Sequence, residues 1–144
     1  MLYVGIDPGM DGAVVALDAQ GHAVLAVSMP TLPAGTGGKR ILDTRGLLDL
    51  FEGQFVADYF VAIEEPGVRP GEGASRSLAM GRNHGRIEGL LVGIRAQFEC
   101  VHPRRWQKAL GFIPGDPKAQ AILTCQRTIP DLNLIPGRCK KPQE

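Results

Sequence analysis

The chain has 144 residues, of which 44% are hydrophobic and 22% charged; this composition is typical of one globular domain and excludes extensive disorder. No apolar run approaches the roughly 18 residues of a membrane span, and the first residues lack the basic leader and apolar core of a secretory signal. Cys100, Cys125 and Cys139 form an odd set without CxxC spacing, which argues against a zinc site or a disulfide framework. We therefore expect a protein of a reducing compartment such as the cytoplasm, neither secreted nor bound to a membrane.

The net charge of +1 conceals an uneven distribution of charge along the chain. Residues 1–65 hold 3 basic and 9 acidic residues, a net charge of −6, whereas residues 66–144 hold 13 basic and 6 acidic residues, a net charge of +7. An acidic half beside a basic half suggests a chain that holds a metal cation and contacts a polyanion. The alternative is that the two halves interleave in space and their charges mix.

Three short apolar segments joined by tight turns open the chain. They cover residues 2–7, 13–18 and 22–29, with Pro8-Gly9 and Gln20-Gly21 as turn signals. Short apolar runs separated by such turns predict an antiparallel meander.

A Pro- and Gly-rich loop is expected over residues 30–40 and a helix over 43–54. The loop resembles a phosphate-binding loop only superficially, because Lys39 is followed by Arg40 where a Walker motif needs Ser or Thr. This departure excludes a Walker-type nucleotide site, and we expect no nucleotide cofactor.

The strongest strand signal lies at residues 59–65, where an apolar run ends in Glu64 and Glu65. Both of its faces are apolar, which predicts a sheet covered on both sides. The elements expected after it are a loop over 67–75, one long helix over 76–98, a strand over 99–102 and a helix near 117–128. The resulting order, β-β-β-α-β-α-β-α, indicates an α/β fold.

Acidic residues end two of the predicted strands, namely Asp7 in the first and Glu64 and Glu65 in the fourth. If these strands are parallel neighbours, their carboxylates converge at one edge of the sheet and repel one another unless a hard cation such as Mg²⁺ lies between them. Such an ion can activate water for phosphodiester hydrolysis. Side-chain alternation does not decide which glutamate points into this site. The alternative is that Asp7 is a turn residue and the glutamates form a solvated strand end.

The predicted helix over 76–98 carries a small residue at every fourth position: Ser77, Gly81, Gly85, Gly89 and Gly93. Glycine costs roughly 1 kcal/mol at an interior helix position, so close approach of another backbone is the expected compensation. That backbone could belong to a neighbouring strand of the sheet, to a second subunit or to a nucleic acid.

Basic residues of the second half and of the loop over 30–40 form a candidate nucleic-acid surface, because phosphate backbones are bound by Lys and Arg without a strict motif. We expect Trp106 to be a core or hinge anchor and assign no role to His84 or His102. The residues expected at the nucleic-acid surface are Lys39, Arg40, Arg69, Arg76, Arg82, Arg86, Arg105, Lys108, Lys140 and Lys141.

Four segments in this order resemble the RuvC-like Holliday-junction resolvases over essentially the whole chain. They are GIDPGMDGAVVALD at 5–18, VAIEEPG at 61–67, MGRNHGRIEGLL at 80–91 and VHPRRWQKALG at 101–111. The phage and chloroplast branches look closest, since they share the Pro-x-x-Trp-x-Lys element. The resemblance implies a single RNase H-like domain over residues 1–144, with three antiparallel strands and then parallel strands in a mixed five-stranded sheet flanked by helices.

The resemblance also implies an activity. Proteins of this family are homodimers that bind four-way DNA junctions and make paired, symmetric nicks with Mg²⁺ or Mn²⁺, so a bacterial or phage-infected cell is the expected setting. Asp7 matches the first catalytic acid and metal ligand, and Glu64 matches the second. Lys118 and the Lys140-Lys141 pair lie where the family often places basic residues near the scissile phosphate.

One departure from the family pattern leaves an alternative open. The family's third acidic cluster opens a further helix, and this sequence stops at Glu144 where that run would begin. We therefore expect the final catalytic helix to be lacking, and the alternative function is a branched-DNA-binding module that does not cleave. A third possibility, an actin-like phosphotransfer half-domain suggested by GIDPG, needs a second lobe that 144 residues cannot supply.

Overall fold

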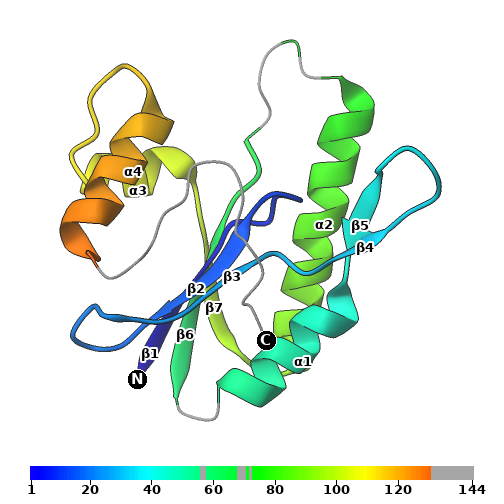
Figure 1. Ribbon diagram of the computed structural model, residues 1–144, viewed down its shortest axis with the longest axis horizontal. Helices are drawn as coiled ribbons and strands as arrows, with labels where there is room; N and C mark the ends of the chain where they lie inside the picture. The colour runs from blue at the N-terminus through cyan, green and yellow to red at the C-terminus, as the bar shows by residue number, and fades with distance from the viewer. Residues whose placement is uncertain (56–57, 68–70, 72, 131–144) are drawn as a thin grey trace.

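A mixed five-stranded sheet forms the centre of the computed structural model, which describes residues 1–55, 58–67, 71 and 73–130 (Figure 1). The strands of this sheet are β1 (Leu2–Ile6), β2 (Ala13–Leu17), β3 (Ala23–Ser28), β6 (Tyr59–Glu64) and β7 (Gln97–Val101). A separate hairpin consists of β4 (Thr31–Pro33) and β5 (Arg40–Leu42). The helices are α1 (Thr44–Gln54), α2 (Ala74–Gly93), α3 (Pro103–Ala109) and α4 (Pro117–Thr128).

The strand order is β3-β2-β1-β6-β7. The first three strands pair antiparallel, and β6 then runs parallel to both β1 and β7. The predicted combination of an antiparallel meander followed by parallel strands is therefore confirmed. In the parallel pair, Ile6 stands opposite Ile63, so the carboxyl ends of β1 and β6 reach the same edge of the sheet.

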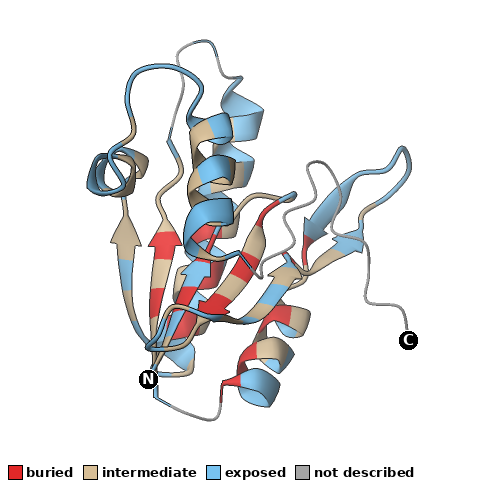
Figure 2. Cartoon of the chain, turned by 60° about the vertical axis from the view of Figure 1, so that its left-hand side comes forward, coloured by how far each residue is buried: buried red, intermediate tan, exposed pale blue. Residues whose placement is uncertain are grey.

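Helices α1 and α2 cover one face of the sheet and close the hydrophobic core. Alternate strand residues such as Val4, Ile6 and Ile63 point toward this face, and Figure 2 shows the alternation of buried and less buried positions. They pack with Leu47 of α1 and Ile87 of α2, both fully buried. The apolar periodicity of the strands and helices thus places the core between the sheet and these two helices.

The opposite face of the sheet differs from the sequence-based expectation. Tyr3 and Val24 point to that face and are 50% and 53% exposed. The prediction of a sheet covered on both sides is therefore wrong at these positions within the described part of the chain. The apolar residues of 59–65 do not require a covered second face, because half-buried aromatic and β-branched residues are also common on partly open faces.

The β4–β5 hairpin occupies the segment that was expected to be a loop. Thr31 pairs with Leu42 and Pro33 with Arg40, and Gly35, Gly37 and Gly38 form the tip in left-handed conformations. Proline and glycine in this segment gave a strong loop signal. Both residue types are nevertheless compatible with a short hairpin that lies outside the main sheet.

Helix α2 ends at Gly93, earlier than the predicted 98, and β7 accordingly begins at Gln97. Helix α2 ends in a Schellman motif around Arg95, which has a φ of 57°. Its N–H donates to the carbonyl of Val92, and the N–H of Ala96 donates to the carbonyl of Leu91. Because an arginine holds the left-handed position that glycine usually holds, the sequence carried no visible stop signal.

Short helix α3 was not predicted, whereas α4 confirms the helix expected near 117–128. His102 caps α3: its Nδ1 accepts from the N–H of Arg104 at 3.2 Å, and Pro103 takes the first helical position. Asp116 caps α4 in the same way. Among the described residues, no helix has the length and apolar character needed to span a membrane.

The glycines of α2 do not contact the sheet. A Cβ added at Gly81, Gly85, Gly89 or Gly93 would meet nothing within 4 Å in the described structure. The residues of α2 that are buried are instead His84, Ile87 and Leu91. A close contact with a neighbouring strand is therefore excluded as the reason for the glycines. A second subunit and a nucleic acid remain predictions.

Candidate active site

A pocket of about 560 Å³ lies where β1 and β6 end and α2 and α3 begin. Carboxylates from the acidic half of the chain and cationic side chains from the basic half meet in it. Its polar lining residues are Asp7, Glu64, Glu65, Arg76, His102, Arg104 and Gln107. The two halves of opposite charge therefore come together at one site.

Asp7 is held by the tight loop that follows β1. The N–H of Gly9 donates to Asp7 Oδ1 at 2.9 Å, and the N–H of Asp7 donates to the carbonyl of Ala13 at 3.0 Å. A Cβ on Gly12 would lie 2.1 Å from the main-chain oxygen of Asp7, so this position accepts only glycine unless the loop moves. The Asp-Pro-Gly-x-x-Gly sequence thus fixes where the carboxylate stands.

Glu64 is the last residue of β6 and is partly buried. The indole Nε1 of Trp106 donates to Glu64 Oε1 at 3.0 Å, across 42 positions of sequence. Burial raises the pKa of Glu64, the Trp106 hydrogen bond partly opposes this, and the negative charge of Asp7 raises the pKa further. Asp7 and Glu64 are therefore close enough to repel each other.

Glu65 also lines the pocket, on the opposite side of the strand from Glu64. Its N–H donates to the carbonyl of Val101, and its charge contributes to raising the pKa of Cys100, on β7. Continuing the parallel register one step beyond Ile6 and Ile63 sets Asp7 beside Glu64. The geometry favours Glu64 over Glu65 as the partner of Asp7.

Trp106 lies outside the buried core of the described residues, so the expected core role is not seen, and its side chain contacts the acidic site instead. Its ring meets Phe112 edge-on, with centroids 5.4 Å apart, and its N–H reaches Glu64. A half-buried indole N–H requires an acceptor, and the carboxylate supplies it. Helix α3 therefore holds Glu64 in place through this single hydrogen bond.

The basic residues predicted for nucleic acid fall into three groups. Arg76 lines the pocket. Arg40 pairs with Asp11, and Arg105 lies 3.4 Å from Glu99. Lys39 in the β4–β5 hairpin, Arg82 and Arg86 on α2 and Lys108 on α3 are exposed and lie outside the pocket lining. Lys118, predicted as a catalytic residue near the scissile phosphate, is also exposed and outside the lining, in the first turn of α4.

Arg69, Lys140 and Lys141 lie outside the described residues.

Sequence reasoning missed part of the pocket wall, chiefly His102, Arg104 and Gln107. All three belong to the first turns of α3 or to its cap, and α3 itself was not predicted. The signal that was available is the His-Pro pair directly after a strand, since His can cap a helix and proline favours the first helical position.

The carboxylate oxygens of Asp7 and Glu64 are suitable ligands for a hard divalent cation. Asp7 Oδ1 and Glu64 Oε1 accept hydrogen bonds that orient each carboxylate. The second oxygen of each has no hydrogen-bond partner among the described residues, so two oxygens remain as ligands. Mg²⁺ and Mn²⁺ prefer such sites, with a few carboxylates and several waters. The cation would also relieve the repulsion between Asp7 and Glu64.

Comparison with solved structures identifies proteins of similar fold. Thermus thermophilus RuvC in complex with a Holliday junction substrate superposes with a TM-score of 0.67 and 15% sequence identity, over 96% of this chain and 83% of that one. A second Thermus thermophilus RuvC structure gives a TM-score of 0.59 and 19% identity, over 96% and 85% of the two chains. No protein-family model matches the sequence, and no curated protein matches it significantly.

The superposition covers the mixed sheet and its flanking helices, and it confirms the predicted architecture. It does not test the phage or chloroplast branch. At this level of identity the likeness concerns the path of the backbone, so the role of each side chain must be argued from the pocket itself. The chain has the RNase H-like fold of the RuvC resolvases.

Proposed function

We propose that this protein is a metal-dependent endodeoxyribonuclease that resolves four-way DNA junctions by paired, symmetric nicks. The observation that carries the proposal is the meeting of Asp7 and Glu64 at the ends of two parallel strands, with Arg76 and Arg104 lining the same pocket. The shared fold with a RuvC structure that holds a Holliday junction substrate supports it.

Asp7 and Glu64 are the residues that would hold Mg²⁺, with Mn²⁺ as a substitute. When bound, the ion supplies Lewis-acid stabilisation and lowers the pKa of coordinated water. Trp106 keeps one oxygen of Glu64 fixed, and Gly9 does the same for Asp7. Arg76 and Arg104, which line the pocket, would attract a phosphodiester into it.

The exposed cations outside the pocket would extend the contact along the DNA backbone. Lys39, Arg82, Arg86 and Lys108 are exposed and come from three different elements. Lys118 is proposed to act near the scissile phosphate, which requires α4 to approach the pocket when DNA is bound. Binding through these residues is expected to weaken steeply as salt concentration rises.

A homodimer is proposed through α2. Leu78 and Val92 are 63% and 64% exposed, and helical spacing sets them on the same face as Gly85 and Gly89. Small residues between exposed apolar ones allow two helices to approach closely. Two copies of the pocket on one junction would account for paired nicks.

The alternative function is a module that binds branched DNA without cleaving it. The acids of the described pocket are Asp7, Glu64 and Glu65, and the third acidic cluster implied by the resemblance is not among the described residues. Binding would then need the basic residues but no metal.

A synthetic four-way junction with labelled ends distinguishes the two functions. The protein is incubated with the junction with and without Mg²⁺; native gels score binding and denaturing gels score nicks. Paired nicks that require Mg²⁺ support the resolvase. Metal-independent binding without nicks supports the binding module, and a protein with no preference for branched over linear DNA contradicts both.

A further inference from the structure

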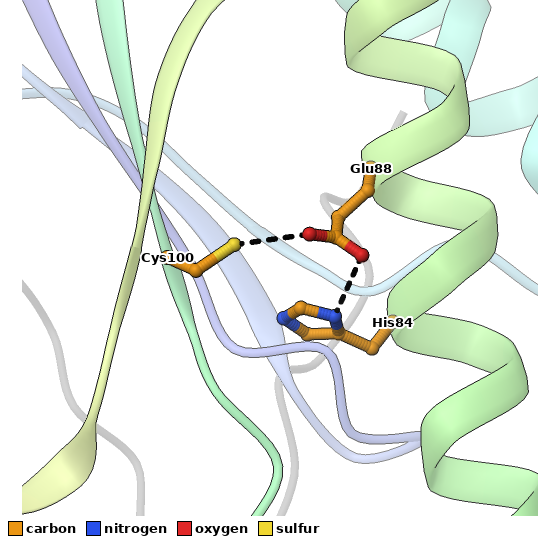
Figure 3. Close-up of side chains that lie close together, drawn as sticks. All are labelled: His84, Glu88 and Cys100. Carbon is orange, nitrogen blue, oxygen red and sulfur yellow. Dashed lines mark hydrogen bonds and ion pairs between the residues drawn. The ribbon is translucent and has the colours of Figure 1, made fainter.

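Three side chains with metal-binding atoms meet between α2 and β7, outside the pocket described above (Figure 3). His84 and Glu88 lie four residues apart on α2 and share one face, while Cys100 projects from β7. His84 Nδ1 lies 3.2 Å from Glu88 Oε2, and Cys100 Sγ donates to Glu88 Oε1 at 3.2 Å. One ligand atom from each residue lies within 4.8 Å of the other two.

His84, a member of this cluster, carries an unpaired polar atom. The residue is only 9% exposed, and its Nε2 has no hydrogen-bond partner among the described residues. Nδ1 faces the carboxylate of Glu88, which favours the tautomer with the proton on Nδ1 and leaves a bare lone pair on Nε2. Figure 3 shows Nε2 on the side of the ring that faces Cys100. Buried polar atoms are rarely left unpaired, so this one points to a ligand.

We propose that His84, Glu88 and Cys100 form a second cation site, selective for Zn²⁺ and similar borderline-soft ions. Nitrogen, oxygen and sulfur are the zinc ligands of proteins, whereas a thiolate and an imidazole are poor ligands for Mg²⁺. With bonds of about 2.0–2.3 Å, the ligands of a tetrahedral zinc ion lie roughly 3.3–3.8 Å apart. Cys100 Sγ and Glu88 Oε1 are 3.2 Å apart, and one ligand atom of each residue already lies within 4.8 Å of the other two, so side-chain rotations can bring His84 Nε2, Glu88 and Cys100 to these separations.

The hydrogen bond between Cys100 and Glu88 indicates which proton a cation would replace. The Cys100 thiol donates a hydrogen bond to the Glu88 carboxylate. On binding, that proton leaves to solvent and the sulfur binds as a thiolate, so the cation takes the place of the proton between Cys100 and Glu88. The Glu88 side chain is 40% exposed, which gives a cation access and leaves room for water as a fourth ligand.

The bound cation would tie α2 to β7. Arg76 and Met80, about two turns and one turn before His84 on the same helix, line the acidic pocket. A metal clamp at His84 would therefore stabilise the helix that forms one wall of that pocket. The inference is independent of the proposed nuclease function, because the site can be measured in the absence of DNA.

The test uses a protein in which Cys100 is the only cysteine, made by Cys125→Ser and Cys139→Ser. Titration with Co²⁺ alone is expected to give a thiolate-to-cobalt charge-transfer band and the visible bands of tetrahedral cobalt. Zn²⁺ should displace both and raise the melting temperature. Cys100→Ser should abolish the charge-transfer band, and His84→Gln or Glu88→Gln should weaken cobalt binding by roughly 10-fold or more.

The matched control is His22→Gln, which removes a surface histidine that pairs with Asp18 away from the cluster. It should leave cobalt binding unchanged. Absence of a thiolate band in the single-cysteine protein, with a native circular dichroism spectrum, overturns the proposal. Unchanged affinity in both His84→Gln and Glu88→Gln overturns it equally, and these two variants decide the matter if Cys100→Ser does not fold.

Discussion

The acidic pocket and the His84–Glu88–Cys100 cluster share the helix α2 but differ in burial and in donor atoms. The pocket is open, collects oxygen ligands from two strand ends, and has arginines in its wall. In the cluster, His84 is buried, and the possible ligand atoms are a nitrogen, an oxygen and a sulfur. On the two proposals, one scaffold would offer a hard-cation site for chemistry and a softer site for structure within a few helical turns.

The largest expected effect is the loss of cleavage in Asp7→Asn. The substitution keeps the shape of the side chain but removes the charge that would hold the cation, so junction cleavage should fall by roughly 10³-fold or more. The measurement is single-turnover cleavage of a labelled junction in Mg²⁺. The control is Asp11→Asn in the same loop, which removes only the partner of Arg40. Equal losses in both variants would show that the loop, and not the Asp7 charge, matters.

The alkylation rate of Cys100 tests the environment of the His84–Glu88–Cys100 cluster and does not depend on the acidic pocket. Burial, together with the hydrogen bond to Glu88, raises the pKa of Cys100 to about 11. Its thiolate fraction, and hence its alkylation rate, should rise with pH up to that value. Near pH 8 the single-cysteine protein should react roughly 100-fold more slowly than free cysteine. Rapid alkylation of the folded protein near pH 8 would contradict this environment.

Trp106→Phe tests whether α3 positions Glu64. Phenylalanine keeps the ring contact with Phe112 but cannot donate to Glu64, so cleavage should fall by roughly 10–100-fold and more Mg²⁺ should be needed for half-maximal rate. The matched control is Phe112→Leu, which removes the ring contact and keeps the hydrogen bond. A purely structural role for Trp106 would lower the melting temperature in both variants without changing the Mg²⁺ requirement.

Gly12→Ala tests the loop that holds Asp7. The added Cβ would meet the main-chain oxygen of Asp7 at 2.1 Å, so the loop must shift. We expect a loss of about 1–3 kcal/mol in the free energy of unfolding, measured by urea denaturation, together with weaker cleavage. Gly53→Ala in α1 is the control, because its Cβ would meet nothing and should be neutral or stabilising.

Substitution of the regularly spaced glycines of α2 should have the smallest effect on the stability of the fold. Gly85→Ala and Gly89→Ala should each stabilise the monomer by about 0.5–1 kcal/mol, since the added Cβ is unopposed. If a second copy packs on this face, the same substitutions should shift the protein toward monomer in sedimentation velocity. A dimer that is unaffected by both variants would place the interface elsewhere.

The main sheet and the acidic pair could be predicted because their signals are local. The apolar runs at 2–7 and 59–65 each end in an acid, and the parallel pairing of β1 and β6, which the sequence left as a condition, brings those two ends together. The Trp106–Glu64 hydrogen bond could not be predicted, because it joins residues 42 positions apart through a helix with no strong sequence signal.

The cluster escaped prediction for a related reason. His84 received no role because its partner Glu88 lies on the same helix and Cys100 on a later strand, and only the packing of α2 on β7 brings them together. The absence of CxxC spacing argued against a zinc site, but that spacing matters only where both cysteines come from one local segment. The early end of α2 was also invisible, since Arg95 adopts a conformation that usually signals glycine.

The most direct test of the central claim uses a supercoiled plasmid that extrudes a cruciform. Paired nicks across one junction convert it to linear DNA in a single binding event, whereas unpaired nicks give open circles. We expect linear plasmid with the wild-type protein in Mg²⁺, and none with chelator or with Asp7→Asn. Linear product that persists in Asp7→Asn, or an uncut cruciform that the wild-type protein binds in Mg²⁺, would contradict the assignment of Asp7 and Glu64 as the metal site of a resolvase.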